Sequence, residues 1–156
     1  MLDLIAGFLV GVSMVTLVLV FCVMNIEIVT RYLFGVSTLI ADEYGGYGLT
    51  VVILSGLMYA HRSGALLKVE MGLGLMGRRT RSAALAIASL ASVVLAAFSA
   101  YAGYQTWSLS WLFGSASAFA SETPLWIPQA VIPFGFFLLS LSFTEEFVSR
   151  LYGAGR

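Results

Sequence analysis

The sequence predicts an all-α, polytopic membrane protein with four transmembrane helices and both termini in the cytoplasm. Of its 156 residues, 60% are hydrophobic and 10% are charged, whereas an ordinary soluble domain is about 25% charged. Four windows without a charged residue reach or approach the roughly 20 residues that a helix needs to cross a hydrocarbon core of about 30 Å. The alternating ten-residue segments that are typical of outer-membrane barrels are absent from the sequence.

The four uncharged windows set the expected helices. They cover residues 4–26, 44–60, 82–121 and 123–144. No basic residue precedes the first window and no small-residue cleavage pattern closes it, so we interpret it as a retained anchor rather than a signal peptide. We expect one membrane domain, 1–156, with an interfacial loop at about 63–81 and helices at about 4–34, 42–62, 82–113 and 125–150.

The distribution of Lys and Arg predicts the orientation. Seven of the eight basic residues share one side if both termini are cytoplasmic, and Arg31 alone lies opposite. The loop at 63–81 mixes apolar residues and glycines with charges, which is typical of a segment in the headgroup region. An ordinary stop-transfer cluster of basic residues explains it equally well. The residues expected at lipid headgroups are Arg62, Arg78, Arg79 and Arg81.

The spans lack the groups that most membrane chemistry requires. Ion and proton pathways place ionisable residues inside the membrane, but here the central stretches of the four predicted helices contain none. The single histidine, His61, stands beside Arg62 and is interpreted as an interfacial residue rather than a haem or metal ligand. Balanced charge, with eight basic and eight acidic residues, indicates no nucleic-acid partner. We therefore predict no catalytic, cofactor or metal site, and no enzyme activity.

The spans do carry small residues at the spacing of helix-packing motifs. Gly7 and Gly11 form a GxxxG pair, and the second helix opens with Gly45, Gly46 and Gly48. These residues either hold the four helices together or form a surface for another membrane protein. The third helix has a row of small residues at every fourth position, namely Ala84, Ala88, Ser92, Ala96 and Ala100.

The densest polar stretch runs from Glu27 to Glu43. Glu27 and Arg31 lie four residues apart on one helix face, and the acids Asp42 and Glu43 complement the dipole of the helix they begin. Helix-end chemistry explains the acids, but it does not explain an ordered string of elements that starts here. The string consists of Arg31-Tyr32-x-Phe34, Ala41-Asp42-Glu43, Gly56, Arg62-x-Gly64 followed by Val69-Glu70, and Thr123 to Pro128.

This string resembles the small membrane subunit of tripartite ATP-independent periplasmic (TRAP) transporters, the DctQ-like family. The family ends its first helix with R-Y-x-F, follows with a W-x-E-E-like element and closes the second helix with R-x-G-x-H-I-x-V-[DE]. The length and the four predicted spans agree as well. The sequence departs from the pattern at three places, with Ile40 in place of tryptophan, Asp42 as the first acid, and Leu66-Leu67 in place of histidine-isoleucine.

The resemblance implies a small accessory subunit that enlarges the scaffold of a sodium-coupled symporter for organic acids. In such systems a large membrane subunit carries the substrate and sodium sites, and a periplasmic substrate-binding protein delivers the substrate. The implied location is the inner membrane of a bacterium or archaeon, among phospholipids. The residues expected at the partner interface are Arg31, Tyr32, Asp42, Glu43 and Gly56.

Two alternatives remain open from the residues alone. The first is that the chain is a structural subunit of another inner-membrane complex, for which the packing residues are equally suitable. The second is that it is a self-contained small exporter, assembled as a homo-oligomer. It would require a membrane-embedded acid, which the windows lack.

Overall fold

Long helices make up most of the part of the chain that the structure describes. The computed structural model describes residues 2–37, 39–65, 77–119 and 121–153. Most of the loop expected at the membrane surface, 66–76, and the side chains of Arg78 and Arg79 lie outside that description. The helices are α1 (Leu2–Phe34), α2 (Ile40–Arg62), α4 (Arg78–Phe113), α5 (Trp126–Gln129) and α6 (Val131–Gly153).

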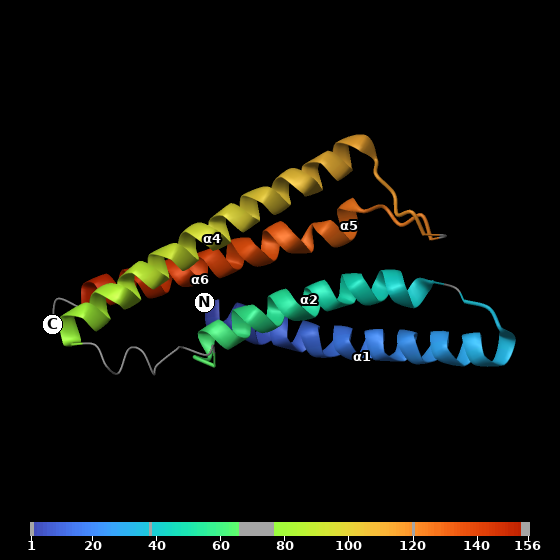
Figure 1. Ribbon diagram of the computed structural model, residues 1–156, viewed down its shortest axis with the longest axis horizontal. Helices are drawn as coiled ribbons and strands as arrows, with labels where there is room; N and C mark the ends of the chain where they lie inside the picture. Colours follow the sequence, from blue (N-terminus) through green and yellow to red (C-terminus); the bar gives the residue numbers. More distant parts are fainter. Residues whose placement is uncertain (1, 38, 66–76, 120, 154–156) are drawn as a thin grey trace.

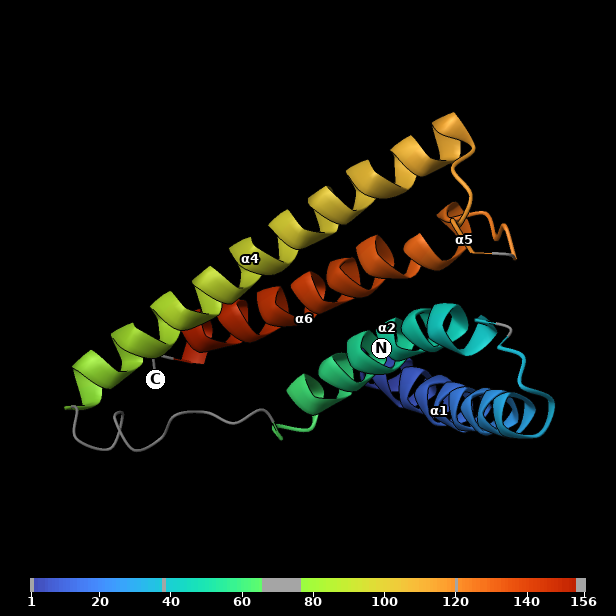
Figure 2. The same cartoon turned by 45° about the vertical axis from the view of Figure 1, so that its right-hand side comes forward.

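The helices form two antiparallel hairpins that lie side by side (Figures 1 and 2). Helix α1 packs along α2, and α4 packs along α6 with the short α5 at its end. The two hairpins meet where α2 contacts α6, which is a smaller interface than the one inside either hairpin. The helices therefore follow one another in space in the order α1, α2, α6, α4, rather than closing into a bundle around one axis.

Glycine allows the close approach of α1 and α2. A Cβ atom added at Gly48 would lie 2.3 Å from Val20 Cγ2, and one at Gly45 would lie 3.1 Å from Met24 Cε. Gly46, on another side of α2, and Gly7 and Gly11 on α1 have no such neighbour within 4 Å. The GxxxG pair of α1 therefore faces open space among the described residues.

Small residues one heptad apart line the contact of α4 with α6. Ser89, Ala96 and Ser110 are buried, and a Cβ atom at Gly103 would lie 3.0 Å from Ile132 Cγ2. A seven-residue repeat keeps one seam of a helix against its partner. The expected row at every fourth position shares only Ala96 with this seam, because a four-residue step drifts around the helix.

The last predicted helix is broken near its start. The helix expected over 125–150 consists of α5 and α6, with Ala130 between them. Pro133 lacks an N–H group, so it cannot donate to the carbonyl four residues earlier, that of Gln129. The backbone continues in helix-like geometry at Ala130, and the long apolar run is otherwise retained.

The meeting point of the hairpins contains the most completely buried apolar side chains. Ala6 of α1, Met58 of α2 and Leu139 of α6 form one cluster. A Cβ atom at Gly135 of α6 would lie 2.9 Å from Leu54 Cδ1, so these helices also approach closely. Ser142 beside them is 0% exposed. Large apolar side chains packed against Ala6 and Gly135 thus form the apolar part of the contact between the hairpins.

Three helices are long and apolar enough to cross a membrane, within Leu2–Phe34, Thr80–Phe113 and Trp126–Arg150. The 23-residue α2 is not among them, and its first turns carry Asp42, Glu43 and three glycines. Large apolar side chains on the spans point outward, as in Phe98, which is 67% exposed. The all-helical class is confirmed, with three apolar spans among the described residues, one fewer than the four predicted.

Candidate functional site

The polar side chains gather at the two ends of the helices. We call the end that contains the last turns of α1, the start of α2 and the loop 114–125 the acidic end. The opposite end contains the start of α1 and the last turns of α2 and α6, and we call it the ion-pair end. Between them the sequence has no charged residue in 4–26, 44–60 or 82–121.

At the acidic end, Arg31 closes the turn after α1. Its Nη2 donates to Ser37 Oγ at 2.9 Å and lies 3.4 Å from Glu27 Oε1, and Ser37 Oγ donates to the same Glu27 oxygen at 2.7 Å. Glu27 is buried, whereas the Arg31 side chain is 57% exposed. The i, i+4 pair expected from the sequence is present, and it also holds the turn.

Glu43 attaches the loop 114–125 to α2. Its carboxylate accepts hydrogen bonds from Tyr47 Oη at 2.9 Å and from Ser121 Oγ. Tyr44 Oη and Thr123 Oγ1 lie 3.0 Å apart and form a second link to the same loop. Glu43 is only 4% exposed, so its carboxylate has an internal structural partner.

The other residues expected at the partner interface are more open. Tyr32 is 91% exposed at the end of α1. Asp42 is exposed, and its carboxylate makes no hydrogen bond or ion pair with a residue that the structure describes. A Cβ atom at Gly56, in the second half of α2, would have no neighbour within 4 Å. The structure therefore brings Arg31 and Asp42 to one end, and it places Gly56 away from them.

Two small cavities share Asp42. One, of about 280 Å³, lies between α1 and α2 beside Arg31 and Tyr32. The other, of about 370 Å³, lies between α2, the loop 114–125 and the start of α6. Asp42 is thus the free carboxylate between two hollows at the acidic end.

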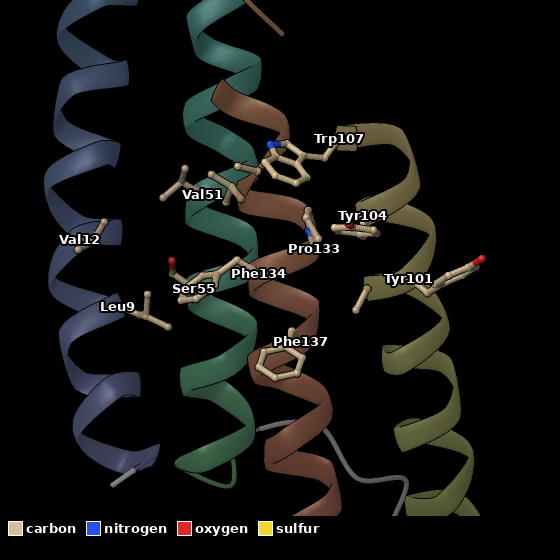
Figure 3. A pocket seen from close by; sticks show the side chains of 13 residues that line it. Leu9, Val12, Val51, Ser55, Tyr101, Tyr104, Trp107, Pro133, Phe134 and Phe137 are labelled. Atoms are coloured by element: carbon tan, nitrogen blue, oxygen red, sulfur yellow. The ribbon is translucent and has the colours of Figure 1, made fainter. Parts of the chain in front are cut away.

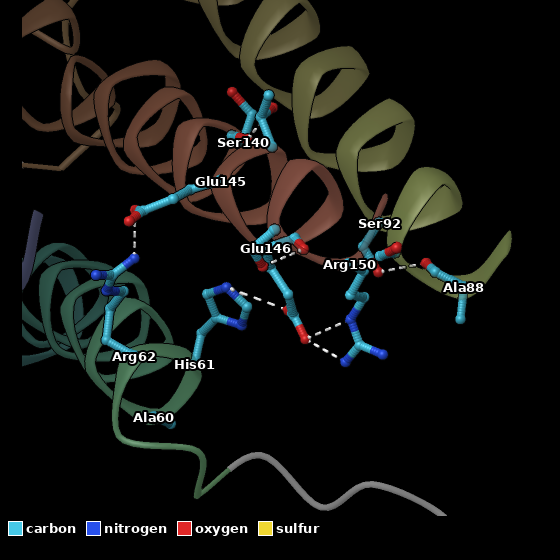
Figure 4. Close-up of polar contacts among 12 residues, drawn as sticks. Ala60, His61, Arg62, Ala88, Ser92, Ser140, Glu145, Glu146 and Arg150 are labelled. Carbon is cyan, nitrogen blue, oxygen red and sulfur yellow. Dashed lines mark hydrogen bonds and ion pairs between the residues drawn. The ribbon is translucent and has the colours of Figure 1, made fainter. Parts of the chain in front are cut away.

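A network of ion pairs joins the two hairpins at the ion-pair end (Figure 4). Arg62 of α2 contacts Asp3 of α1 at 2.6 Å through Nη2 and Glu145 of α6 at 2.6 Å through Nη1. The sequence predicts lipid headgroups for Arg62, but two carboxylates already bind its guanidinium. Its contact with headgroups stays a prediction.

His61 belongs to the same end and contacts α6. Its Nε2 lies 3.6 Å from Glu146 Oε2, and its ring centroid lies 4.3 Å from that of Phe143. Glu146 also binds Arg150, with Oε1 2.5 Å from Nη2. No group of three or more His, Cys, Asp or Glu side chains in the described parts of the chain is arranged to hold a metal ion. Only the i, i+4 spacing of Glu146 and Arg150 signals this network in the sequence.

The middle of the molecule has an apolar groove of about 970 Å³ that crosses all four long helices (Figure 3). Leu9 of α1, Val51 of α2, Phe134 of α6 and Tyr104 of α4 line it. Aromatic rings continue along α4 to the start of α5, where the ring centroids of Trp111 and Trp126 lie 4.6 Å apart. Such aromatic groups are typical of the level where a membrane meets water.

The family of the chain follows from comparison with known sequences. The model of the family described as "Tripartite ATP-independent periplasmic transporters, DctQ component" matches residues 20–153. The chain belongs to this family. The resemblance found in its ordered motifs is thereby confirmed, and the DctQ chain is a component of a TRAP transporter. No curated protein matches it.

Proposed function

We propose that this DctQ protein is the small accessory subunit of a sodium-coupled TRAP symporter for organic acids. It pairs with a large membrane subunit that carries the substrate and sodium sites. A periplasmic binding protein delivers the substrate to that large subunit. The observation that carries the proposal is the family match over residues 20–153. The uncharged interval between the two polar ends supports it, because ion or acid transport needs ionisable or polar groups inside the membrane.

We propose four spans in the inner membrane, with both termini cytoplasmic. Helix α2 supports the fourth span, since its 23 residues correspond to about 35 Å of helix. It runs antiparallel to α1, and its charged ends lie at the same two ends of the molecule as those of its neighbours. In this orientation the acidic end is periplasmic, and the ion-pair end is cytoplasmic together with the start of α4.

The orientation is tested with the arginines at the start of α4. A reporter enzyme that works only in the periplasm, fused to the C-terminus, is expected to be inactive. Replacing Arg78, Arg79 and Arg81 together by alanine removes the positive charges that hold this side at cytoplasmic headgroups. The variant is expected to give reporter activity in a measurable fraction of the molecules. An active wild-type fusion would refute the orientation, and an unchanged variant would refute the role of the arginines.

The accessory role is tested by identifying what the chain binds. The C-terminally tagged protein, extracted from its native membrane in mild detergent, is expected to co-purify with one large polytopic protein in stoichiometric amount. The pair in vesicles should take up an organic acid only with a sodium gradient. Recovery of this chain alone as a defined oligomer would favour a self-contained exporter. A partner from another membrane complex would favour a structural subunit elsewhere.

A further inference from the structure

The acidic end has more carboxylates than it satisfies internally. Glu27 is paired with Arg31, and Glu43 accepts hydrogen bonds from Tyr47 and Ser121. The Asp42 carboxylate has no hydrogen bond or ion pair with the described residues. Arg31 is the only Lys or Arg in the sequence from Met1 to Tyr59. It lines the smaller cavity together with Asp42, but its ion pair is with Glu27, so Asp42 is a carboxylate without an ion-pair partner among the described residues.

Asp42 stands at the edge of the 370 Å³ cavity, which has two kinds of wall. The polar side comes from α2 and Gln129, and the apolar side comes from the loop 114–125 and the first turns after it. Gly46 forms part of the α2 side, and a Cβ atom there would have no neighbour within 4 Å. The polar lining residues are Asp42, Glu43, Tyr47, Thr50 and Gln129, and the apolar ones are Phe119, Leu125, Pro128 and Ile132.

A second unsatisfied acceptor belongs to the same cavity. The Oε1 atom of Gln129 is buried and has no hydrogen-bond partner. Buried polar atoms in proteins are nearly always paired, because leaving one unpaired costs its full desolvation. The cavity therefore combines the Asp42 carboxylate with a lining glutamine whose amide oxygen is covered and lacks a donor, and a turn of the Gln129 side chain would present that oxygen to a ligand.

The ligand that fits this cavity is a hydrogen-bond donor group at the end of an apolar methylene stem. A guanidinium group has five N–H donors and no acceptor, so it can serve a carboxylate and an amide oxygen together. Its methylene stem would lie against Phe119 and Leu125, as long basic side chains do on apolar surfaces. An anion would be repelled by Asp42 and Glu43, and a bare ion would leave the apolar walls without contacts.

We propose that this cavity receives one basic side chain, an arginine in preference to a lysine, from the large membrane subunit. The inference rests on the proposed accessory role. It assigns the contact to the membrane partner because the cavity extends from Asp42 to Thr50, about 12 Å along α2. A side chain that enters beside the helices reaches that depth more directly than one from a soluble protein resting on the helix ends.

The test uses the complex with the large subunit and either fills the cavity with a side chain or removes the negative charge of Asp42. Gly46→Leu places a side chain in the open space, and Asp42→Asn removes the free charge. Each is expected to weaken the affinity for the purified large subunit at least tenfold. The matched controls are Gly46→Ala, which adds one methyl group, and Glu122→Gln, which removes an exposed acid outside the cavity. Both controls are expected to stay within twofold of the wild type.

Thermal unfolding of each isolated variant shows whether the chain still folds, and a Leu at the open position of Gly46 should not lower its stability. The proposal would be overturned if Gly46→Leu and Asp42→Asn bound the large subunit with wild-type affinity. It would also be overturned if Glu122→Gln lost as much affinity as Asp42→Asn. If assembly is normal and only the binding protein fails to dock, the membrane partner is the wrong occupant. A wild-type chain that binds no large subunit refutes the accessory role itself, which this series detects separately.

Discussion

Gly48→Ala is expected to lower the free energy of unfolding by about 2 kcal/mol, and Gly48→Leu by more, because overpacked cores cost roughly 1–3 kcal/mol. The new Cβ atom would lie 2.3 Å from Val20 Cγ2 and 3.4 Å from Thr16 Cγ2, in the contact between α1 and α2. Val20 cannot turn aside, since a β-branched residue in a helix has one strongly preferred rotamer. Unfolding in a detergent series measures the change.

A double-mutant cycle separates the clash from other effects of the substitution. In the Val20→Ala background the methyl group at position 48 has room, so Gly48→Ala should then cost less than about 0.5 kcal/mol, the size of effect expected without coupling. Gly46→Ala is the matched control, because that position faces open space on the same helix. An equal loss in both backgrounds would show that α1 and α2 do not approach as described.

The glycines show how far the sequence predicts packing. Gly45, Gly46 and Gly48 are predicted together as small residues at the start of one helix, and the structure separates them. Gly45 and Gly48 face α1, whereas Gly46 faces the cavity. Helical spacing tells which residues share a face, but it does not tell which neighbour that face meets. The GxxxG pair of Gly7 and Gly11 matches a packing motif and meets no neighbouring atom in the described chain.

The candidate site was predictable to a similar degree. The motif string located Arg31, Asp42 and Glu43, and the structure places them at one end of the molecule. Asp42 and Glu43 are adjacent in sequence, but successive residues of a helix point about 100° apart. One carboxylate is therefore exposed and the other is buried against Tyr47 and the loop. Which of the two carboxylates is buried depends on the position of the loop, whose Ser121 is 78 residues from Glu43.

The ion-pair end was the least predictable part. Each Arg62 partner is distant in sequence, since Asp3 is 59 residues away and Glu145 is 83 away. Local spacing carries no signal for such contacts, so a basic residue at a helix end is naturally assigned to lipid. The structure instead gives Arg62 carboxylates from two other helices, one of them in the second hairpin.

Arg62→Ala is expected to destabilise the contact between the hairpins by about 2 kcal/mol, a typical value for charge-assisted hydrogen bonds. The expected loss of stability is no larger because water screens the partners, the side chains of Asp3 and Glu145, which are 73% and 55% exposed, although that of Arg62 is only 18% exposed. Without the guanidinium, two carboxylates remain near each other without a counter-charge. Thermal unfolding in mild detergent, with hydrogen exchange of α2 and α6, measures the loss.

Two variants determine whether the bridging geometry matters rather than charge alone. Arg62→Lys keeps the charge but has no planar fork to reach two carboxylates in fixed directions, so it should recover only part of the stability. Arg150→Ala breaks a pair within α6, Glu146 to Arg150, and such i, i+4 pairs contribute about 0.2–0.5 kcal/mol. If Arg62→Ala costs no more than Arg150→Ala, the ion pairs do not hold the hairpins together. In that case the buried cluster of Ala6, Met58 and Leu139 joins them without this electrostatic contribution.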